Sequence, residues 1–250
     1  MNLINVFDIK NKDIITIVGS GGKTSLMFSI SSLLRQDYKV LVTTTTNIYV
    51  PDSRTVEFDK FCLIDDEELK NIIKNDKTGV YVIGSKIINN LDKPKLRGLT
   101  FEMIDKIAHF FDIILIEGDG SKEKPLKGWL DNEPVVYDKT TKTIGVIDIN
   151  SIGLDINEDN IHRLDNFLDM INDEKSSKVK VKHLKNIVLN KHGLFKLSKG
   201  EKILFINKSE SIKNKTNASL LIKEIKDENS YYIDNFVYGS LINNEFLTLY

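Results

Sequence analysis

Cysteine, proline and tryptophan are all scarce in this 250-residue sequence, which has one cysteine, four prolines and one tryptophan. A single cysteine, Cys62, cannot form a disulfide within the chain, so the class of small secreted domains stabilised by disulfides is excluded. The first residues lack the basic and apolar segments of a signal peptide, and no apolar run reaches the length of about 20 residues that a membrane-spanning helix needs. We therefore expect a cytoplasmic protein with no membrane partner.

An excess of charge of either sign is also lacking, because 35 Lys and Arg residues face 36 Asp and Glu residues. Without a strongly positive field the chain has no general attraction for nucleic acid, so any anion-binding site must be local. The four histidines show no close metal-ligand spacing, and no Cys-x-x-Cys pair occurs. These absences argue against nucleic-acid partners and against a structural zinc site.

The hydrophobic pattern alternates between strands and helices. Short apolar runs rich in β-branched residues predict buried parallel strands at 14–18, 39–44, 79–83, 112–117, 143–149 and 202–207. Helical spacing predicts helices after residue 24 and within 65–74, 100–110, 158–171 and 217–227, and a closing strand within 231–242. This alternation indicates an α/β fold with a doubly wound, mostly parallel sheet of the P-loop NTPase-like kind.

The same pattern divides the chain into three segments. We expect residues 1–150 to form a P-loop nucleotide-binding core, residues 151–195 a small helical insertion, and residues 196–250 a return to the core sheet. In such sheets the ligand binds in the crevice at the carboxyl ends of the strands.

A glycine-rich loop stands between the first predicted strand and the helix that follows it. The strict phosphate-loop spacing G-x-x-x-x-G-K-[ST] fails because position 17 is Ile, but the shorter G-x-x-G-K-[ST] form is present and resembles the loop of Mur-type amino-acid ligases. Glycines let backbone N–H groups approach phosphate, Lys23 neutralises its charge, and Thr24 can ligate Mg²⁺. The alternative is a tight turn with a solvated lysine. The candidate ligands are Gly19, Ser20, Gly21, Gly22, Lys23, Thr24 and Ser25.

Acidic and hydroxyl side chains follow two further strands. The run "DIILIEGDG" (112–120) ends in Glu117 and Asp119, where P-loop proteins keep an acidic group near the metal. The sequence leaves open which carboxylate faces the metal, and a capped turn is the alternative. In "TTTTNIYVP" (43–51), Thr44 or Thr45 is positioned to reach metal or the γ-phosphate, although threonine also simply favours strands. The candidate metal ligands are Thr24, Thr45 and Asp119.

The segment "INKSE" (206–210) is close to the N-K-x-D element with which many GTPases recognise guanine. Asn207, Lys208 and Glu210 are its candidate nucleotide-binding residues, with Glu210 in the place of the shorter aspartate. Asn-Lys pairs are frequent in this chain, and "LNKHG" (189–193) is a second example, so coincidence is an alternative. The sequence therefore predicts binding of ATP or GTP and does not decide between the two nucleotides.

A polar segment, residues 121–134, follows the acidic strand end. Long loops of this kind are usually functional or mobile. Lys122, Lys124 and Lys127 could meet an anionic second substrate that Trp129 shields from water. The alternative is a solvated lysine-rich lid with Trp129 packed as an anchor.

Several of these segments together resemble the YqeC-type accessory proteins of selenium-dependent molybdenum hydroxylases. The matching stretches, in family order, are "VGSGGKTSLMF", "VLVTTTTNIYVP", "LIEGDGSKEKPLKGWLDNEPVV", "NIHR" and "LFINKSE". The resemblance implies a cytoplasmic P-loop protein that helps to mature the selenium-containing molybdenum cofactor, with a molybdenum hydroxylase or a selenium donor protein as partner. It also implies phosphate binding by Gly19, Gly22, Lys23 and Thr24. Tyr137 departs from the family pattern, which has proline there.

Three functions fit these observations. The first is a Mg²⁺-dependent NTPase or phosphotransferase in which Lys23, Glu117 and Asp119 act in catalysis. The second is a nucleotide-switched chaperone that delivers cofactor or selenium to an apo-hydroxylase without making a bond itself. The third is an ATP-dependent ligase related to the Mur-type loop, for which the sequence shows no amino-acid substrate domain.

Overall fold

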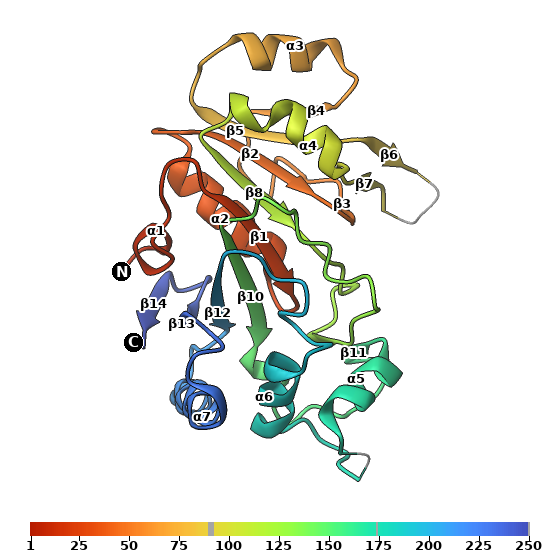
Figure 1. Cartoon of the computed structure of the whole chain (residues 1–250), viewed down its shortest axis with the longest axis vertical. Helices are drawn as coiled ribbons and strands as arrows, with labels where there is room; N and C mark the ends of the chain where they lie inside the picture. The colour runs from red at the N-terminus through yellow and green to blue at the C-terminus, as the bar shows by residue number, and fades with distance from the viewer. Residues whose placement is uncertain (90–92, 174, 250) are drawn as a thin grey trace.

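A nine-stranded sheet forms the centre of the protein (Figure 1). The computed structural model describes residues 1–89, 93–173 and 175–249. All neighbouring strands of the sheet are parallel except the pair β13–β14. In spatial order, the strands are β14 (Glu245–Thr248), β13 (Asn235–Ser240), β12 (Glu201–Asn207), β10 (Lys142–Asp148), β1 (Ile14–Gly19), β8 (Ile113–Glu117), β2 (Lys39–Thr44), β5 (Gly79–Gly84) and β4 (Lys60–Leu63).

The six parallel strands predicted from the sequence are β1, β2, β5, β8, β10 and β12. Strands β2, β5, β8 and β10 are buried along their whole length, which explains why their sequences read as continuous apolar runs rather than alternating ones. A strand buried on both faces requires helices on both sides of the sheet. The predicted α/β class with a doubly wound, mostly parallel sheet is confirmed.

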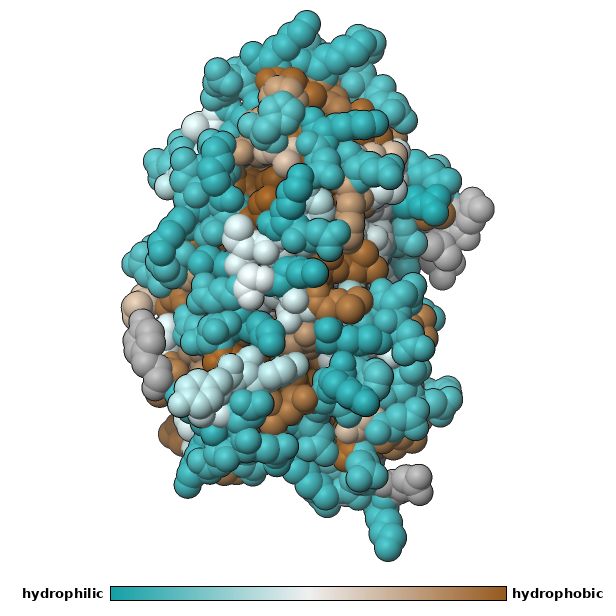
Figure 2. Space-filling model, in the orientation of Figure 1, coloured by the Kyte–Doolittle hydropathy of each residue, from teal (hydrophilic) through white to brown (hydrophobic). Residues whose placement is uncertain are grey.

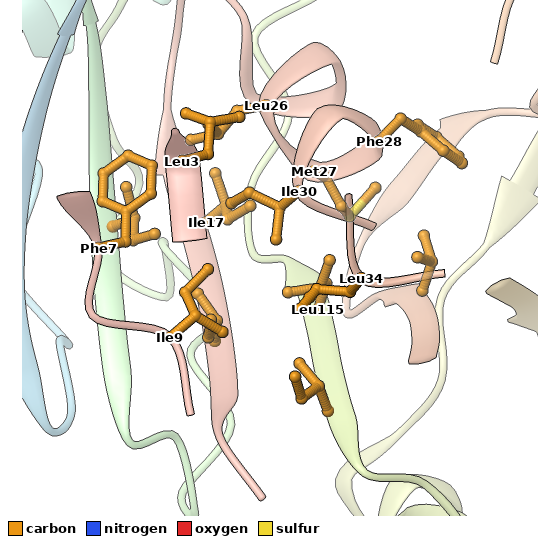
Figure 3. Packing of buried hydrophobic residues seen from close by; sticks show 14 of the residues in the cluster. Leu3, Phe7, Ile9, Ile17, Leu26, Met27, Phe28, Ile30, Leu34 and Leu115 are labelled. Carbon is orange, nitrogen blue, oxygen red and sulfur yellow. The ribbon is translucent and has the colours of Figure 1, made fainter. Parts of the chain in front are cut away.

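Helices cover both faces of this sheet. Side chains on one face pack with α1 and α2, as Figure 3 shows for Ile17 and Leu115 against Leu26 and Ile30. Alternate side chains point to the other face, where α3 and α4 cover one half of the sheet and α5, α6 and α7 the other. The helices are α1 (Leu3–Val6), α2 (Lys23–Leu34), α3 (Glu67–Lys74), α4 (Phe101–Ile107), α5 (Leu164–Ile171), α6 (Val181–Leu189) and α7 (Ile212–Asn229).

Helices α5 and α6 lie in the chain between β10 and β12, within the segment 151–195. Their buried side chains share one apolar cluster with Ile147 of β10, Leu204 of β12 and residues of α7. Helix α6 carries Lys182 and Lys185 but still packs on the sheet, because its other face supplies apolar residues, including Leu184 and Ile187.

Two small sheets lie beside the central one, and the sequence pattern does not predict either. Strands β3 (Asn47–Tyr49), β7 (Lys95–Arg97) and β6 (Lys86–Ile88) form an antiparallel sheet. Strand β9 (Leu126–Lys127) pairs with β11 (Ile161–His162), so the segment 121–134 is partly ordered by a strand about 35 residues further on.

The face of the molecule in Figure 2 is mainly hydrophilic, with scattered hydrophobic residues. Within the described part of the chain, no helix combines the length and the apolar character needed to cross a bilayer.

The environment of Cys62 gives a test of the fold. Cys62 lies on β4 and is 2% exposed, and burial, with smaller contributions from Asp66 and Glu68, raises the pKa of its thiol to about 11. Because the thiolate is the reactive form, we expect a thiol reagent at neutral pH to label the folded protein orders of magnitude more slowly than the unfolded chain. Absorbance after addition of Ellman's reagent, with and without guanidinium chloride, measures both rates. Equal rates would contradict the buried position of β4.

Candidate functional site

The loop between β1 and α2 has a backbone that only glycine adopts easily. Gly19, Gly21 and Gly22 have φ values of 101°, 87° and 128°. A Cβ atom on Gly21 would lie 2.4 Å from the Cβ of Asp148, because the loop passes close to the end of β10. The three glycines are therefore required by this path of the chain.

The N-terminus of α2 is open to a ligand. Gly22 is the N-cap, no side chain caps the helix, and its first turn has no acidic residue. The first N–H groups of a helix have no partners within the helix, and the helix dipole favours an anion beside them. The local structure therefore has the features of a phosphate-binding loop.

A cleft of about 550 Å³ lies over this loop. Its volume is within the usual range of small-molecule sites. Five lysines and two glutamates line it, in a chain whose net charge is −1, so positive charge is concentrated here. The lining residues are Gly21, Gly22, Lys23, Thr24, Ser25, Asn47, Ile48, Tyr49, Lys95, Glu117, Gly120, Ser121, Lys122, Glu123, Lys124, Pro125 and Lys208.

Lys23, Thr24 and Glu117 meet at the floor of the cleft. Nζ of Lys23 donates a hydrogen bond to the carbonyl oxygen of Gly19 at 2.7 Å and lies 3.6 Å from Oε1 of Glu117. Oγ1 of Thr24 donates to Oε2 of Glu117 at 2.7 Å. The structure thus brings together three of the predicted site residues from segments almost 100 positions apart.

Charge pairing keeps Lys23 cationic in spite of its burial. Burial by itself lowers the pKa of a lysine, but the carboxylates of Asp119 and Glu117 outweigh it and raise the pKa of Lys23. Burial raises the pKa of Glu117, and Lys23 and Thr24 only partly oppose this effect. A fixed positive charge therefore lies beside a carboxylate that ionises less readily than usual.

Asp119 lies outside the cleft lining and holds the loop from within the protein, with Oδ1 3.4 Å from Nζ of Lys23. Its two carboxylate oxygens accept hydrogen bonds from the backbone N–H of Gly19 at 3.0 and 3.1 Å, from Nζ of Lys127 at 3.0 Å and from Nε1 of Trp129 at 2.8 Å. Asp119 is fully buried. Burial would raise its pKa, but Lys23, Lys127 and these hydrogen bonds hold the pKa below its usual range.

Two of the three expected metal ligands, Asp119 and Thr45, lie outside the cleft lining. Asp119 is absent from the cleft lining, and its oxygens already accept four hydrogen bonds. Thr45 also lies outside the lining and donates through Oγ1 to the carbonyl of Val135 at 2.7 Å, while Thr44 donates to the carbonyl of Glu117. Of the two carboxylates, Glu117 is the one that faces the cleft.

The segment 121–134 has two different parts. Lys122 and Lys124 line the cleft, as an anion-binding role requires. Lys127 does not, because its Nζ is buried between Asp119, the carbonyl of Gly120 and Glu133. Trp129 is also buried, so for Trp129 the structure favours the packed anchor.

Arg163 extends this buried network and was not a candidate on chemical grounds. It pairs through both terminal nitrogens with the carboxylate of Glu133, which also accepts from Lys127. In the sequence, Arg163 belongs to no chemical motif and lies only in the family-like stretch "NIHR". The ionic chain therefore runs from the glycine-rich loop through Asp119, Lys127 and Glu133 to the start of α5.

The segment "INKSE" lies on the other side of the loop. Nδ2 of Asn207 donates to the carbonyl of Gly21 at 2.9 Å, and Lys208 lines the cleft with its Nζ 2.5 Å from Asp148. Glu210 is half-buried and absent from the cleft lining. Asn207 and Lys208 therefore join the predicted site, whereas Glu210 does not contact the cleft in this arrangement.

Sequence reasoning missed Asn47, Tyr49 and Lys95 as residues of the cleft. Asn47 and Tyr49 lie within the segment 43–51, where the run of threonines is the stronger chemical signal. Lys95 has no local signal, because it reaches the cleft only through the pairing of β7 with β3.

Comparison with known proteins identifies relatives but no related experimental structure. A family model described as "YqeC protein" matches residues 15–165, which include the loop, Glu117, Asp119 and Arg163. The chain is 29% identical over 222 residues to "Uncharacterized protein YqeC" of Escherichia coli (strain K12), and the match covers 87% of this chain and 84% of that protein. No solved structure matches.

Replacing Lys127 tests the buried network. Lys127→Met leaves Asp119 and Glu133 without their shared buried cation, so we expect a loss of about 3–5 kcal/mol in the free energy of unfolding. Urea denaturation measures this loss. The matched control is Lys139→Met, which removes an exposed ion pair with Asp105 and should have little effect. Similar urea midpoints of unfolding for the two variants would show that the buried network around Lys127 does not stabilise the fold.

Proposed function

From the premise that this chain belongs to the YqeC family, we propose that it binds a Mg²⁺–nucleoside triphosphate at residues 19–25 and cleaves or transfers the γ-phosphate. The observation that carries the proposal is Lys23, a buried cation between the Gly19 carbonyl and Glu117, beside an uncapped helix start in a lysine-rich cleft. An ammonium group and free backbone N–H groups at one point are what a polyphosphate requires.

The arrangement at Thr24 and Glu117 fits a magnesium ion. Both side chains offer oxygen atoms to the cleft, and Mg²⁺ is usually held by one or two protein oxygens together with substrate phosphates and water. Among the described residues, no group of three or more His, Cys, Asp or Glu side chains is arranged as a protein-only metal cage. When bound, Mg²⁺ would neutralise charge on the β- and γ-phosphates.

The residues of the chain then have separate roles. Lys23 stabilises the negative charge that develops on the transferring group, and the loop N–H groups orient the phosphates. Thr24 and Glu117 hold the metal. Asp119 positions the loop by accepting the N–H of Gly19, so we assign it support of the site rather than direct contact with substrate.

The nucleotide base would lie toward β12. Asn207 and Lys208 approach the loop from that side, which supports a base site there. Guanine recognition would additionally need the carboxylate of Glu210, which lies outside the cleft lining, so the proposal includes both ATP and GTP.

The biological role in the proposal is maturation of the selenium-containing molybdenum cofactor of hydroxylases in the cytoplasm. It rests on the resemblance of the motifs, with a molybdenum hydroxylase or a selenium donor protein as partner. A nucleotide-switched chaperone is the second candidate. The ionic chain that joins Gly19 to Arg163 favours the chaperone function. Through this chain, nucleotide binding or release at the loop would be transmitted to the segment 121–134.

A thermal-shift panel of ATP, GTP and CTP, with and without Mg²⁺, tests nucleotide binding. A ligand at about 100 times its Kd stabilises a protein by about 2.7 kcal/mol. For a chain of this size, that stabilisation raises the melting temperature by roughly 5–10 °C. We expect a Mg²⁺-dependent shift that Lys23→Ala abolishes, each variant being compared with its own ligand-free melting temperature. Equal shifts for Lys23→Ala and the unsubstituted protein would refute the site.

Replacing Thr24 tests the metal role in turnover. Thr24→Ala removes a predicted Mg²⁺ ligand, so we expect phosphate release to fall by about tenfold or more at saturating nucleotide. The control is Thr216→Ala, because Thr216 lies on α7 and, among the described residues, its hydroxyl bonds only to the carbonyl of Ile212 in its own helix. A coupled assay of phosphate release over a range of Mg²⁺ concentrations measures the rate of each variant and its dependence on Mg²⁺. Unchanged Mg²⁺ dependence in Thr24→Ala would exclude it as a ligand.

A further inference from the structure

The cleft has a second wall that the triphosphate proposal does not use. It is formed by Asn47 and Tyr49 of β3, Lys95 of β7 and Lys122, which we call the far wall. Strands β12 and β2 lie on opposite sides of β1, so Asn207 and the far wall flank the phosphate loop from opposite directions. With the base toward β12, the far wall lies toward the γ-phosphate end.

The lysines of the far wall differ in their partners from the other lysines of the cleft. Lys23 is paired with Glu117 and Asp119, and Lys208 with Asp148. Nζ of Lys124, the other lysine of the lining, donates a hydrogen bond to the carbonyl of Glu158. Within the described residues, neither Lys95 nor Lys122 has a carboxylate within ion-pair distance, and both line the cleft. No carboxylate of the described residues neutralises either charge, so both ammonium groups can attract an anionic ligand.

Two contacts hold the far wall in place. Nζ of Lys95 lies 5.2 Å from the centre of the Tyr49 ring, an arrangement in which the ring attracts the ammonium group. The segment that carries Lys122 is tied to the phosphate loop, because Oγ of Ser20 donates to the carbonyl of Pro125 at 2.9 Å. The loop that would bind the triphosphate therefore also positions Lys122.

We propose that the far wall binds a small phosphate-bearing molecule beside the γ-phosphate, as the second substrate of the cleft. This inference rests on the proposed nucleotide function. Two ammonium groups, the Asn47 amide and the Tyr49 hydroxyl supply hydrogen-bond donors from three segments of the chain, and lysine is a common point-charge partner for phosphate. Both groups of residues line the same cleft of about 550 Å³, so the two ligands would lie side by side in it.

The test separates the second ligand from the nucleotide. The protein is first saturated with a non-hydrolysable Mg²⁺–nucleotide analogue, so that the phosphate loop is filled, and is then titrated with pyrophosphate by calorimetry in about 150 mM KCl. We expect the double variant Lys95→Gln, Lys122→Gln to weaken pyrophosphate binding by about tenfold or more and to change the Kd of the analogue by less than about twofold.

The matched control is the double variant Lys86→Gln, Lys213→Gln, which makes the same change in net charge at two exposed lysines outside the cleft. Its affinity for pyrophosphate should equal that of the unsubstituted protein. An equal loss in both double variants would show a general charge effect and would overturn the far-wall site.

Three other results would also overturn it. The first is that the protein binds the nucleotide analogue but does not bind pyrophosphate. This result would refute the far-wall site and leave the nucleotide proposal intact. The second is that the Lys95→Gln, Lys122→Gln variant loses as much affinity for the analogue as Lys23→Ala does. This result would place Lys95 and Lys122 in the nucleotide site. The third is equally tight binding of citrate or of a glutamate-rich peptide. No binding of any nucleotide would instead refute the proposed function itself.

Discussion

The buried carboxylate of Asp119 is the interaction on which the site depends. A charged carboxylate removed from water is strongly unfavourable unless donors replace its hydration. Here the N–H of Gly19, the ammonium of Lys127 and the indole N–H of Trp129 supply those donors. Because one of the donors is the first glycine of the loop, satisfying the carboxylate also fixes the loop backbone.

This constraint explains why the lysine-rich segment after β8 folds inward. Lys127 is fully buried although lysine is rarely so, and Asp119 and Glu133 offset its charge. Arg163 in turn neutralises the remaining charge on Glu133. The loop therefore rests on an ionic network inside the protein, and only the other lysines of the segment are left to line the cleft. A network whose members are all satisfied holds its geometry firmly, which suits a site that must present its donors before the ligand arrives.

The parallel sheet sets the order of groups along the cleft. The carboxyl ends of β12, β10, β1, β8 and β2 meet at one edge, so Asn207, the glycine-rich loop, Glu117 and the far wall follow one another across the sheet. Lys23 links the loop to the end of β8, because its ammonium group offsets the negative charge of Glu117 and Asp119 at the floor of the cleft.

The amino-acid sequence by itself determined the features that depend on neighbouring residues. Continuous β-branched runs specify buried strands, and the glycines before Lys23 specify a turn with positive φ values, because both features depend on local backbone preference and burial. Only the tertiary structure decided between Glu117 and Asp119, since a turn at Gly118 can direct either one to the cleft. It also decided that Lys127 is buried, that Lys95 lines the cleft and that Arg163 joins the network. These outcomes rest on contacts between segments tens of residues apart, such as the hydrogen bond from Gly19 to Asp119, and no local pattern encodes such contacts.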